Sequence, residues 1–169
     1  MENYKTFENA LELFRTKEWI GNYNCIFLAN KDLSNNSNLW GFLGGGLGGA
    51  IGALSESSKQ GAAWGKIGLE NCNTVLINQT EYGIGLIPMK QKKIGMSNME
   101  LDTNRFASIK NEQLQSIVVK KFSVLNKNTK KIIITLKDGT IIRLVAKINE
   151  KTLPYQQQNF KKFIDRYEQ

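Results

Sequence analysis

The sequence predicts an α+β fold with one antiparallel sheet of about seven strands and a helix at each end of the chain. Three observations support this prediction. An apolar repeat with helical spacing opens the chain, short runs of β-forming residues fill its second half, and another helical repeat closes it. With 169 residues, of which 41% are hydrophobic, the chain can bury one sizeable core.

The first expected element is a helix over residues 6–18, which Thr6 can cap. Its apolar residues follow the i, i+3, i+4, i+7 spacing: Phe7, Ala10, Leu11 and Phe14. A break follows, and the dense β-formers of residues 23–29 then predict the first strand. The N-terminal helical segment is therefore assigned to residues 1–22.

A glycine-rich insertion, residues 31–71, separates the first strand from the second. Its centre, residues 39–54, reads LWGFLGGGLGGAIGAL and carries no charge. Seven of the twelve residues from Gly41 to Gly52 are glycine, and the others are apolar. Flexible linkers combine glycine with serine and other polar residues, so this composition is not typical of a linker.

If residues 39–54 form a helix, their glycines make two rows of the kind that lets helices approach closely in membranes. The rows are Gly41, Gly45 and Gly49, and Gly44, Gly48 and Gly52. Such a helix spans about 24 Å, less than the roughly 30 Å of bilayer hydrocarbon. Three interpretations are open: the segment folds back on its own domain, it touches lipid together with Trp40 and Phe42, or its glycine rows mediate self-association.

The second half of the chain contains the remaining strands. They are expected at residues 73–80, 82–88, 105–109, 115–125, 130–137 and 140–147. Gly83 and Gly85 predict a β-bulge or a close approach of another backbone in the second of these runs. The final helix is expected over residues 155–168, where an apolar stripe must cover a sheet or the mouth of a barrel. This stripe consists of Phe160, Phe163, Ile164 and Tyr167.

The Asp138-Gly139 pair is the strongest local signal, because Asp-Gly between two strands is typical of a two-residue hairpin turn. Such a turn pairs Leu136 with Ile141 and fixes the register of the two arms. In this register both faces of the hairpin carry apolar residues, so the pattern does not determine which face belongs to the core.

Several strands, a tight hairpin and a closing amphipathic helix, in this order, resemble the pleckstrin-homology-like (PH-like) fold, including the bacterial PH and GRAM-type versions. The resemblance implies a strongly bent sheet capped by the C-terminal helix, formed by residues 23–30 and 72–169. Residues 75–89 (VLINQTEYGIGLIPM) are also similar to small proteins of Firmicutes bacteria in which a Gly/Ala-rich run precedes the same kind of strand pair. Neither resemblance supplies active-site residues.

The net charge of +8 is concentrated in the second half of the chain. Residues 1–71 contain six Lys or Arg and seven Asp or Glu, whereas residues 72–169 contain seventeen and eight. A basic field of this kind attracts an anionic membrane surface or nucleic acid, and a solvated surface that keeps the protein soluble is the simpler alternative. The lysines expected to meet an anionic ligand are Lys90, Lys92, Lys93, Lys120, Lys121, Lys127, Lys130 and Lys131.

The residue types of the chain exclude much catalytic chemistry. Histidine is absent, so the chain has no His-based acid–base pair, no Ser-His or Cys-His nucleophile and no HExxH zinc site. Lys66 follows a glycine as in a phosphate-binding loop, but Ile67 stands where Ser or Thr is required. We interpret Cys25 and Cys72 as buried small hydrophobic residues. The sequence predicts a protein that is not an enzyme and has neither a cofactor nor a metal.

Two functions fit these observations. The first is a PH-like module that associates with the inner membrane face, or with anionic lipid, through residues 39–54 and the basic surface. The second is a soluble protein–protein interaction or self-associating domain without a membrane role. Nucleic-acid binding is a weaker interpretation, because aromatic residues do not alternate with the basic ones. The first residues lack the pattern of a signal peptide, so we expect a cytoplasmic protein, peripheral to the membrane under the first hypothesis.

Deletion of residues 39–54 tests the lipid-contact interpretation. If this segment touches lipid, a smaller share of the deletion variant than of the full chain should sediment with the membranes of broken cells, because the deletion removes a long uncharged apolar run. Immunoblotting of the two fractions measures this distribution. The same distribution for both proteins would contradict a role of this segment in lipid contact.

Overall fold

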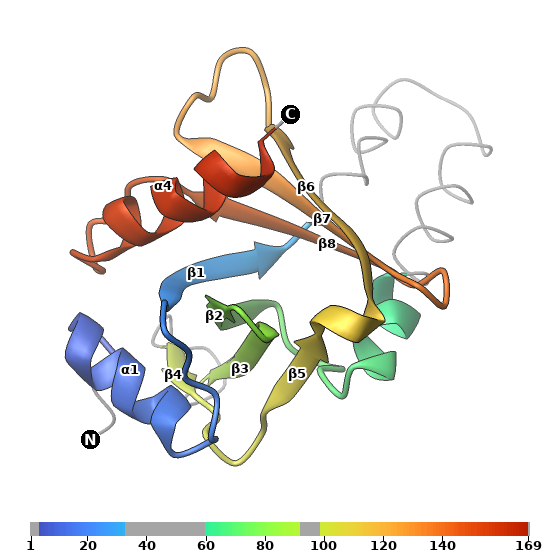
Figure 1. Ribbon diagram of the computed structural model, residues 1–169. Coiled ribbons are helices and arrows are strands. Elements are labelled where there is room, and N and C mark those ends of the chain that lie inside the picture. The colour runs from blue at the N-terminus through green and yellow to red at the C-terminus, as the bar shows by residue number, and fades with distance from the viewer. Residues whose placement is uncertain (1–3, 33–59, 92–98, 169) are drawn as a thin grey trace.

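The computed structural model describes residues 4–32, 60–91 and 99–168 (Figure 1). Outside these ranges lie the glycine-rich segment, residues 39–54, and two of the candidate lysines, Lys92 and Lys93. The described residues form an α+β fold in which helices pack on a single antiparallel sheet. The predicted fold class is confirmed at this level.

The two terminal helices form where the apolar repeats predicted them. In α1 (Phe7–Arg15) the Thr6 side chain caps the start by accepting a hydrogen bond from the Asn9 N–H at 3.3 Å. In α4 (Gln156–Tyr167) the stripe residues Phe160 and Phe163 are fully buried. Residues 60–66 are also helical, and a 3₁₀ turn, η1 (Asn111–Gln113), follows the fifth strand.

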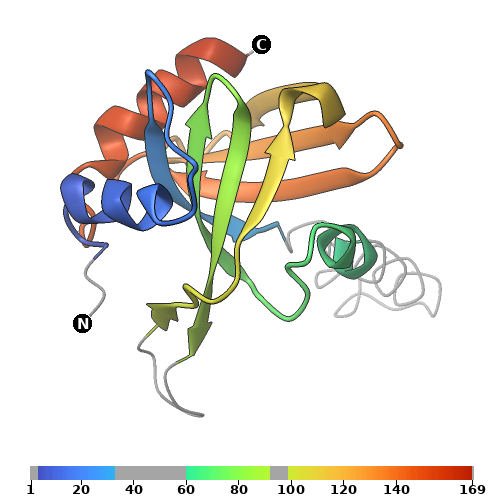
Figure 2. The ribbon, with the colours of Figure 1, turned by 60° about the horizontal axis from the view of Figure 1, so that its bottom comes forward.

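Within the described ranges, eight strands form the sheet. Their bounds are β1 (Cys25–Lys31), β2 (Thr74–Thr80), β3 (Gly83–Gln91), β4 (Met99–Leu101), β5 (Ala107–Lys110), β6 (Leu114–Lys121), β7 (Thr129–Leu136) and β8 (Ile141–Lys147). The strand order is β4-β3-β2-β1-β8-β7-β6, and β5 pairs with β3. The sheet bends so strongly that β2 and β3 run across the direction of β7 and β8 (Figure 2). It is not closed into a barrel, which corrects the barrel alternative of the prediction.

Strand boundaries differ from the prediction at two places. The sequence predicts no strand over residues 99–101, yet β4 forms there against the end of β3. The strand predicted to reach residue 125 ends at Lys121 instead. The Ser123 hydroxyl accepts a hydrogen bond from the Asn126 N–H at 3.0 Å, so a local turn replaces the strand ladder at this point.

The hairpin between β7 and β8 has a three-residue loop, not the predicted two-residue loop. The Leu136 N–H donates to the Thr140 carbonyl oxygen at 2.8 Å, and the Gly139 N–H donates to the Leu136 carbonyl oxygen at 2.9 Å. Gly139 has a φ of +87°, whereas Asp138 is not in the left-handed region. The connection is therefore a turn followed by a left-handed glycine, and it shifts the register by one residue.

The shifted register determines the core face of this hairpin. Thr135 pairs with Ile141 and Ile134 with Ile142, so the predicted pairing of Leu136 with Ile141 is wrong. A shift of one residue changes which side chains share a face, because side chains alternate along a strand. The buried apolar residues of both arms consequently lie on one face: Ile132, Ile134, Leu136, Ile142, Leu144 and Ala146.

Hydrophobic clusters lie on both faces of the β1–β3 region. On one face α4 packs its phenylalanines on β1, with the Phe27 ring centroid 4.8 Å from that of Phe160 and 4.9 Å from that of Phe163. The helical residues 60–66 add the fully buried Trp64 to this cluster. On the other face α1 contributes Phe14 to a second cluster. Figure 1 shows α4 and α1 on opposite sides of β1.

Close packing requires both glycines of β3: the predicted approach of another backbone is found at Gly83, whereas a side chain lies against Gly85. A Cβ atom at Gly85 would lie 2.4 Å from the Trp19 ring. Gly83 has a φ of +138°, and a Cβ atom there would lie 2.1 Å from the Ile109 carbonyl oxygen. Neither position leaves space for a larger residue in the present backbone.

β1 and β8 form a short seam in the middle of the sheet. They pair at Asn30↔Val145 and Lys31↔Leu144, so among the described strands β2 is the only partner of the earlier part of β1. Backbone groups along the other edge of β1 are buried under α4 and need hydrogen-bond partners.

Side-chain amides of α4 supply these partners. Gln156, which is 1% exposed, accepts a hydrogen bond from the Leu28 N–H at 2.7 Å. Its Nε2 donates to the carbonyl oxygens of Leu28 at 3.0 Å and Lys147 at 2.8 Å, and so bridges β1 and the end of β8. Asn159 accepts from the Ile26 N–H at 3.3 Å. The two amides thus act in place of a neighbouring strand.

The side-chain amide of Gln60 likewise satisfies backbone groups of β8, next to the residues where β1 and β8 pair. Its Nε2 donates to the Ile141 carbonyl oxygen at 3.1 Å, and its Oε1 accepts from the Arg143 N–H at 3.1 Å. The Asp32 N–H donates to the Arg143 carbonyl oxygen at 3.0 Å. The chain therefore leaves β1 and returns to the described fold at the same residue of β8.

Substitution of Gln156 tests the amide bridge. We expect Gln156→Ala to lower the free energy of unfolding by about 2–4 kcal/mol, because it leaves buried backbone groups of β1 and β8 without partners. Urea unfolding measures the change, with Gln157→Ala at the adjacent exposed position as the control. Equal stability of the two variants would contradict a structural role for the bridge.

Candidate functional site

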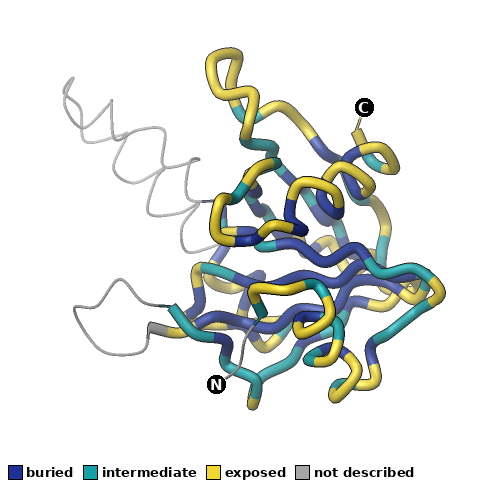
Figure 3. Tube along the Cα trace, turned by 90° about the vertical axis from the view of Figure 1, so that its left-hand side faces the viewer, coloured by how far each residue is buried: buried dark blue, intermediate teal, exposed yellow. Residues whose placement is uncertain are grey.

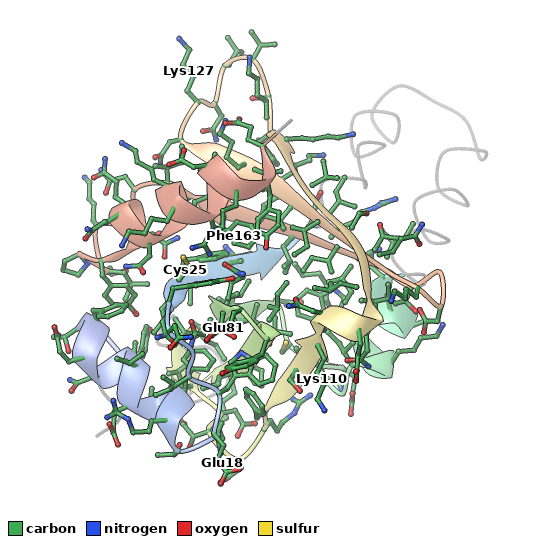
Figure 4. All side chains as sticks on the ribbon, in the orientation of Figure 1. Glu18, Cys25, Glu81, Lys110, Lys127 and Phe163 are labelled. Carbon is green, nitrogen blue, oxygen red and sulfur yellow. The ribbon has the colours of Figure 1, made fainter. Side chains whose placement is uncertain are left out.

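Five of the candidate lysines lie together at one end of the molecule. Lys120 and Lys121 end β6, Lys130 and Lys131 begin β7, and Lys127 lies in the loop between these strands (Figure 4). In the strand register Lys120 is opposite Lys131 and Lys121 is opposite Lys130. We refer to residues 120–131 as the lysine hairpin.

Acidic neighbours neutralise two of these lysines. Lys130 forms an ion pair with Glu168 at the end of α4. Lys131 Nζ lies 3.6 Å from Asp32 Oδ2 and also 5.6 Å from the centroid of the Phe122 ring. These contacts join the base of the lysine hairpin to α4 and to the end of β1, so Lys130 and Lys131 have a structural role.

The other three lysines of the lysine hairpin face solvent and can bind an anionic partner. Lys120, Lys121 and Lys127 are exposed, and no acidic residue within the described ranges pairs with them. Lys120 and Lys121 point to opposite faces of β6 because they are adjacent in a strand. The three ammonium groups therefore surround the tip of the lysine hairpin on more than one side.

Lys90, a further candidate, lies elsewhere on β3. Its Nζ is 3.9 Å from Glu100 Oε1 and 3.7 Å from Asp102 Oδ1. The structure therefore does not bring Lys90 into the lysine hairpin and surrounds it with acidic groups. Lys92 and Lys93 lie outside the described residues, as do the candidate glycines and aromatic residues of the 39–54 segment.

Two large apolar side chains project from the tip of the lysine hairpin. Val124 is 87% exposed and Leu125 is 97% exposed. Figure 3 shows this loop as the exposed projection at the top of the molecule. Exposed apolar residues are common singly, but two adjacent ones at a projecting tip surrounded by free lysines are unusual.

Hydrogen bonds hold the shape of this tip. The Ser123 hydroxyl accepts from the Asn126 N–H at 3.0 Å. Asn128 fastens the far side of the loop, since its Nδ2 donates to the Asn149 carbonyl oxygen at 3.2 Å and its Oδ1 accepts from the Asn149 N–H at 3.0 Å. Val124 and Leu125 are therefore presented to solvent by a defined loop.

The sequence prediction missed this tip because it placed Val124 and Leu125 inside a strand. Their β-forming character favoured that interpretation. The polar residues on either side of this pair indicate a loop. Ser123 precedes the pair, and Asn126-Lys127-Asn128, which contains residues that favour turns, follows it.

A cavity of about 370 Å³ lies between helical residues 60–66 and the β7–β8 loop. Its polar side chains hold these elements together, since Lys66 Nζ donates to the Thr140 hydroxyl at 3.3 Å and Gln60 bonds to the β8 backbone. Among the lining residues that the structure describes, no two side chains are arranged for acid–base or nucleophilic chemistry.

A second cavity, of about 510 Å³, lies at the far end of the molecule from the lysine hairpin (Figure 4). Its charged and aromatic lining consists of Glu18, Trp19, Glu81, Tyr82, Lys110 and Glu112. Within the described ranges no group of three or more His, Cys, Asp or Glu side chains is arranged to hold a metal ion. Three carboxylates in this lining therefore do not form a metal site.

Glu81 is the most constrained carboxylate of this cavity. Its Oε1 accepts a hydrogen bond from the Asn22 N–H at 2.7 Å. This hydrogen bond, with further backbone donors, lowers the pKa of Glu81 from its ordinary value of 4.5. The carboxylate is thus ionised at neutral pH and fastens the segment between α1 and β1 to the β2–β3 turn.

The cysteines are buried and unpaired, as predicted. Burial is the main cause that raises the pKa of the Cys25 and Cys72 thiols. A raised pKa keeps these groups protonated at neutral pH and removes the nucleophilic thiolate. They behave as small apolar residues of the interior.

Comparison with models of known protein families, with curated proteins and with solved structures finds no match for this chain. None of the helices in the described ranges is long and apolar enough to cross a membrane. The geometry of the lysine hairpin is therefore the main basis for a functional assignment.

Glu81→Gln tests the pKa shift of this carboxylate. Its lowered pKa means that Glu81 stabilises the fold above its unfolded pKa, and that this contribution is lost as the pH falls through the folded value. We therefore expect the variant to have a lower urea midpoint than the wild type at pH 7 and the difference to shrink below pH 4.5. A difference that stays constant from pH 7 to pH 3 would refute the shift.

Proposed function

We propose that this protein is a non-enzymatic, PH-like binding module that associates peripherally with an anionic membrane surface through the lysine hairpin. The observation that carries this proposal is the group of three exposed lysines around one projecting loop, for which the described part of the chain provides no acidic partner. Lysine near an anionic bilayer contributes about 1 kcal/mol of binding free energy. The three together correspond to roughly a hundredfold in affinity at low ionic strength.

The distribution of charge over the molecule favours one orientation on such a surface. Glu18 lies at the opposite end of the molecule from Lys127 (Figure 4). With the lysine hairpin against the bilayer, the cavity lined by Glu18, Glu81 and Glu112 faces away from the lipid phosphates. Repulsion between these carboxylates and the membrane is thereby minimised.

The arrangement of the strands supports the PH-like part of the proposal. A strongly bent antiparallel sheet is capped by a C-terminal helix, and its first strand lies beside its last. The bent sheet and the capping helix are the features that the sequence resemblance implies. Function does not follow from such a fold, so the membrane assignment depends on the lysine hairpin.

Vesicle sedimentation tests the proposed function. We expect the wild type to bind vesicles of phosphatidylcholine with phosphatidylglycerol, and not phosphatidylcholine alone, with affinity that falls as salt concentration rises. The triple variant Lys120→Gln, Lys121→Gln, Lys127→Gln should bind roughly a hundredfold more weakly, because it removes the unpaired charges.

A matched triple variant controls for net charge. Lys137→Gln, Lys151→Gln, Lys161→Gln removes the same charge from exposed positions outside the lysine hairpin. We expect this variant to bind nearly as well as the wild type. Equal weakening by both triple variants would indicate a diffuse charge effect, and absence of wild-type binding to anionic vesicles at low salt would reject the function.

A further inference from the structure

We infer that the tip of the lysine hairpin penetrates the bilayer, with Val124 and Leu125 as the side chains that enter the hydrocarbon boundary. This inference rests on the proposed function and extends it, since lysines alone would hold the protein at the level of the lipid headgroups. It specifies the bound partner as an anionic bilayer rather than a soluble anion or a charged protein surface.

The exposure of the tip is the first argument. Val124 and Leu125 are the most exposed large hydrophobic residues of the described ranges, at 87% and 97%. Tyr82 and Ile141 follow at 56% and 36%, each in a different part of the fold. Apolar surface at the tip is therefore concentrated in two adjacent residues and gains from transfer out of water.

The shape of the tip is the second argument. The two residues stand on a projecting loop, not in a concave surface (Figure 3). A protein partner would need a groove that matches this projection, whereas lipid chains adapt to any projecting apolar shape. The convex form therefore favours a fluid bilayer as the partner.

The lysines at the base of the tip are the third argument. Two residues lie between Lys121 and Val124, and one polar residue, Asn126, lies between Leu125 and Lys127. Their long apolar stems can lie along the inserted loop while the ammonium groups remain among the lipid phosphates. Apolar insertion and charge attraction then act at the same depth on one short segment.

The fixed loop conformation is the fourth argument. The bonds from Ser123 to Asn126 and from Asn128 to Asn149 hold the loop before any contact with lipid. A preorganised loop loses little conformational entropy on binding, so more of the free energy of apolar transfer is available for affinity.

Removal of the apolar tip tests the inference. We expect the variant Val124→Ser, Leu125→Ser to bind phosphatidylcholine–phosphatidylglycerol vesicles ten- to hundredfold more weakly than the wild type, with an unchanged salt dependence. Tyr82→Ser, which removes an exposed aromatic side chain at another site, should bind as the wild type does. Urea unfolding of each variant verifies that the fold is retained.

A fluorescent label gives an independent readout of depth. Both native cysteines are buried, so a polarity-sensitive thiol dye will label an introduced cysteine selectively. We expect the dye at Leu125→Cys to shift to shorter wavelength on addition of anionic vesicles and the dye at the exposed control Lys151→Cys to keep its emission.

The outcomes separate this inference from the proposed function. Lysine-dependent vesicle binding that is unaffected by the serine variant, with no shift of the dye at residue 125, overturns penetration and leaves the membrane function intact. Binding that inositol hexakisphosphate abolishes, without any contribution of Leu125, identifies a headgroup site and also overturns penetration. Failure of the wild type to bind anionic vesicles rejects both proposals.

Discussion

The fold depends on how the backbone groups at the seam between β1 and β8 are satisfied. The two strands pair over only two residues and then diverge, and this divergence gives α4 access to the interior. Buried N–H and C=O groups on diverging strands would otherwise lack partners. Gln156 and Asn159 of α4, and Gln60 beyond the other end, provide them with side-chain amides. Helix placement and sheet curvature are therefore coupled through a few buried polar contacts.

The lysines of the lysine hairpin fall into two groups, those that form ion pairs within the fold and those that face solvent. Lys130 and Lys131 are bound to Glu168 and Asp32, and these pairs connect the lysine hairpin to α4 and β1. Lys120, Lys121 and Lys127 have no acidic partner within the described ranges, and they surround a tip that carries exposed apolar residues. The proposed membrane contact therefore uses a local group of side chains within the basic half of the chain.

Local sequence patterns predicted the positions of the helices and strands well, but they predicted strand register and tertiary contacts less well. The apolar repeats located α1 and α4, and the Asp138-Gly139 pair located the β7–β8 hairpin, because these features depend on neighbouring residues. The hairpin register depended on one further loop residue, which the Asp-Gly motif does not specify.

The roles of Gln60 and Gln156 were not predictable, since a buried amide and a solvated one are the same in sequence. The clustering of lysines was visible, but their acidic partners came from distant parts of the chain.

The attachment of Asp32 and Gln60 to one residue of β8 has a consequence for how this chain can vary. The segment between them, residues 33–59, begins and ends at adjacent, fixed points of the sheet. The entropy of closing a flexible chain between two fixed points changes slowly with its length, by about 0.6 kcal/mol for each doubling. A protein engineer can therefore use the position between Asp32 and Gln60 as a graft point for flexible peptides of different lengths, provided that both residues keep their bonds to Arg143.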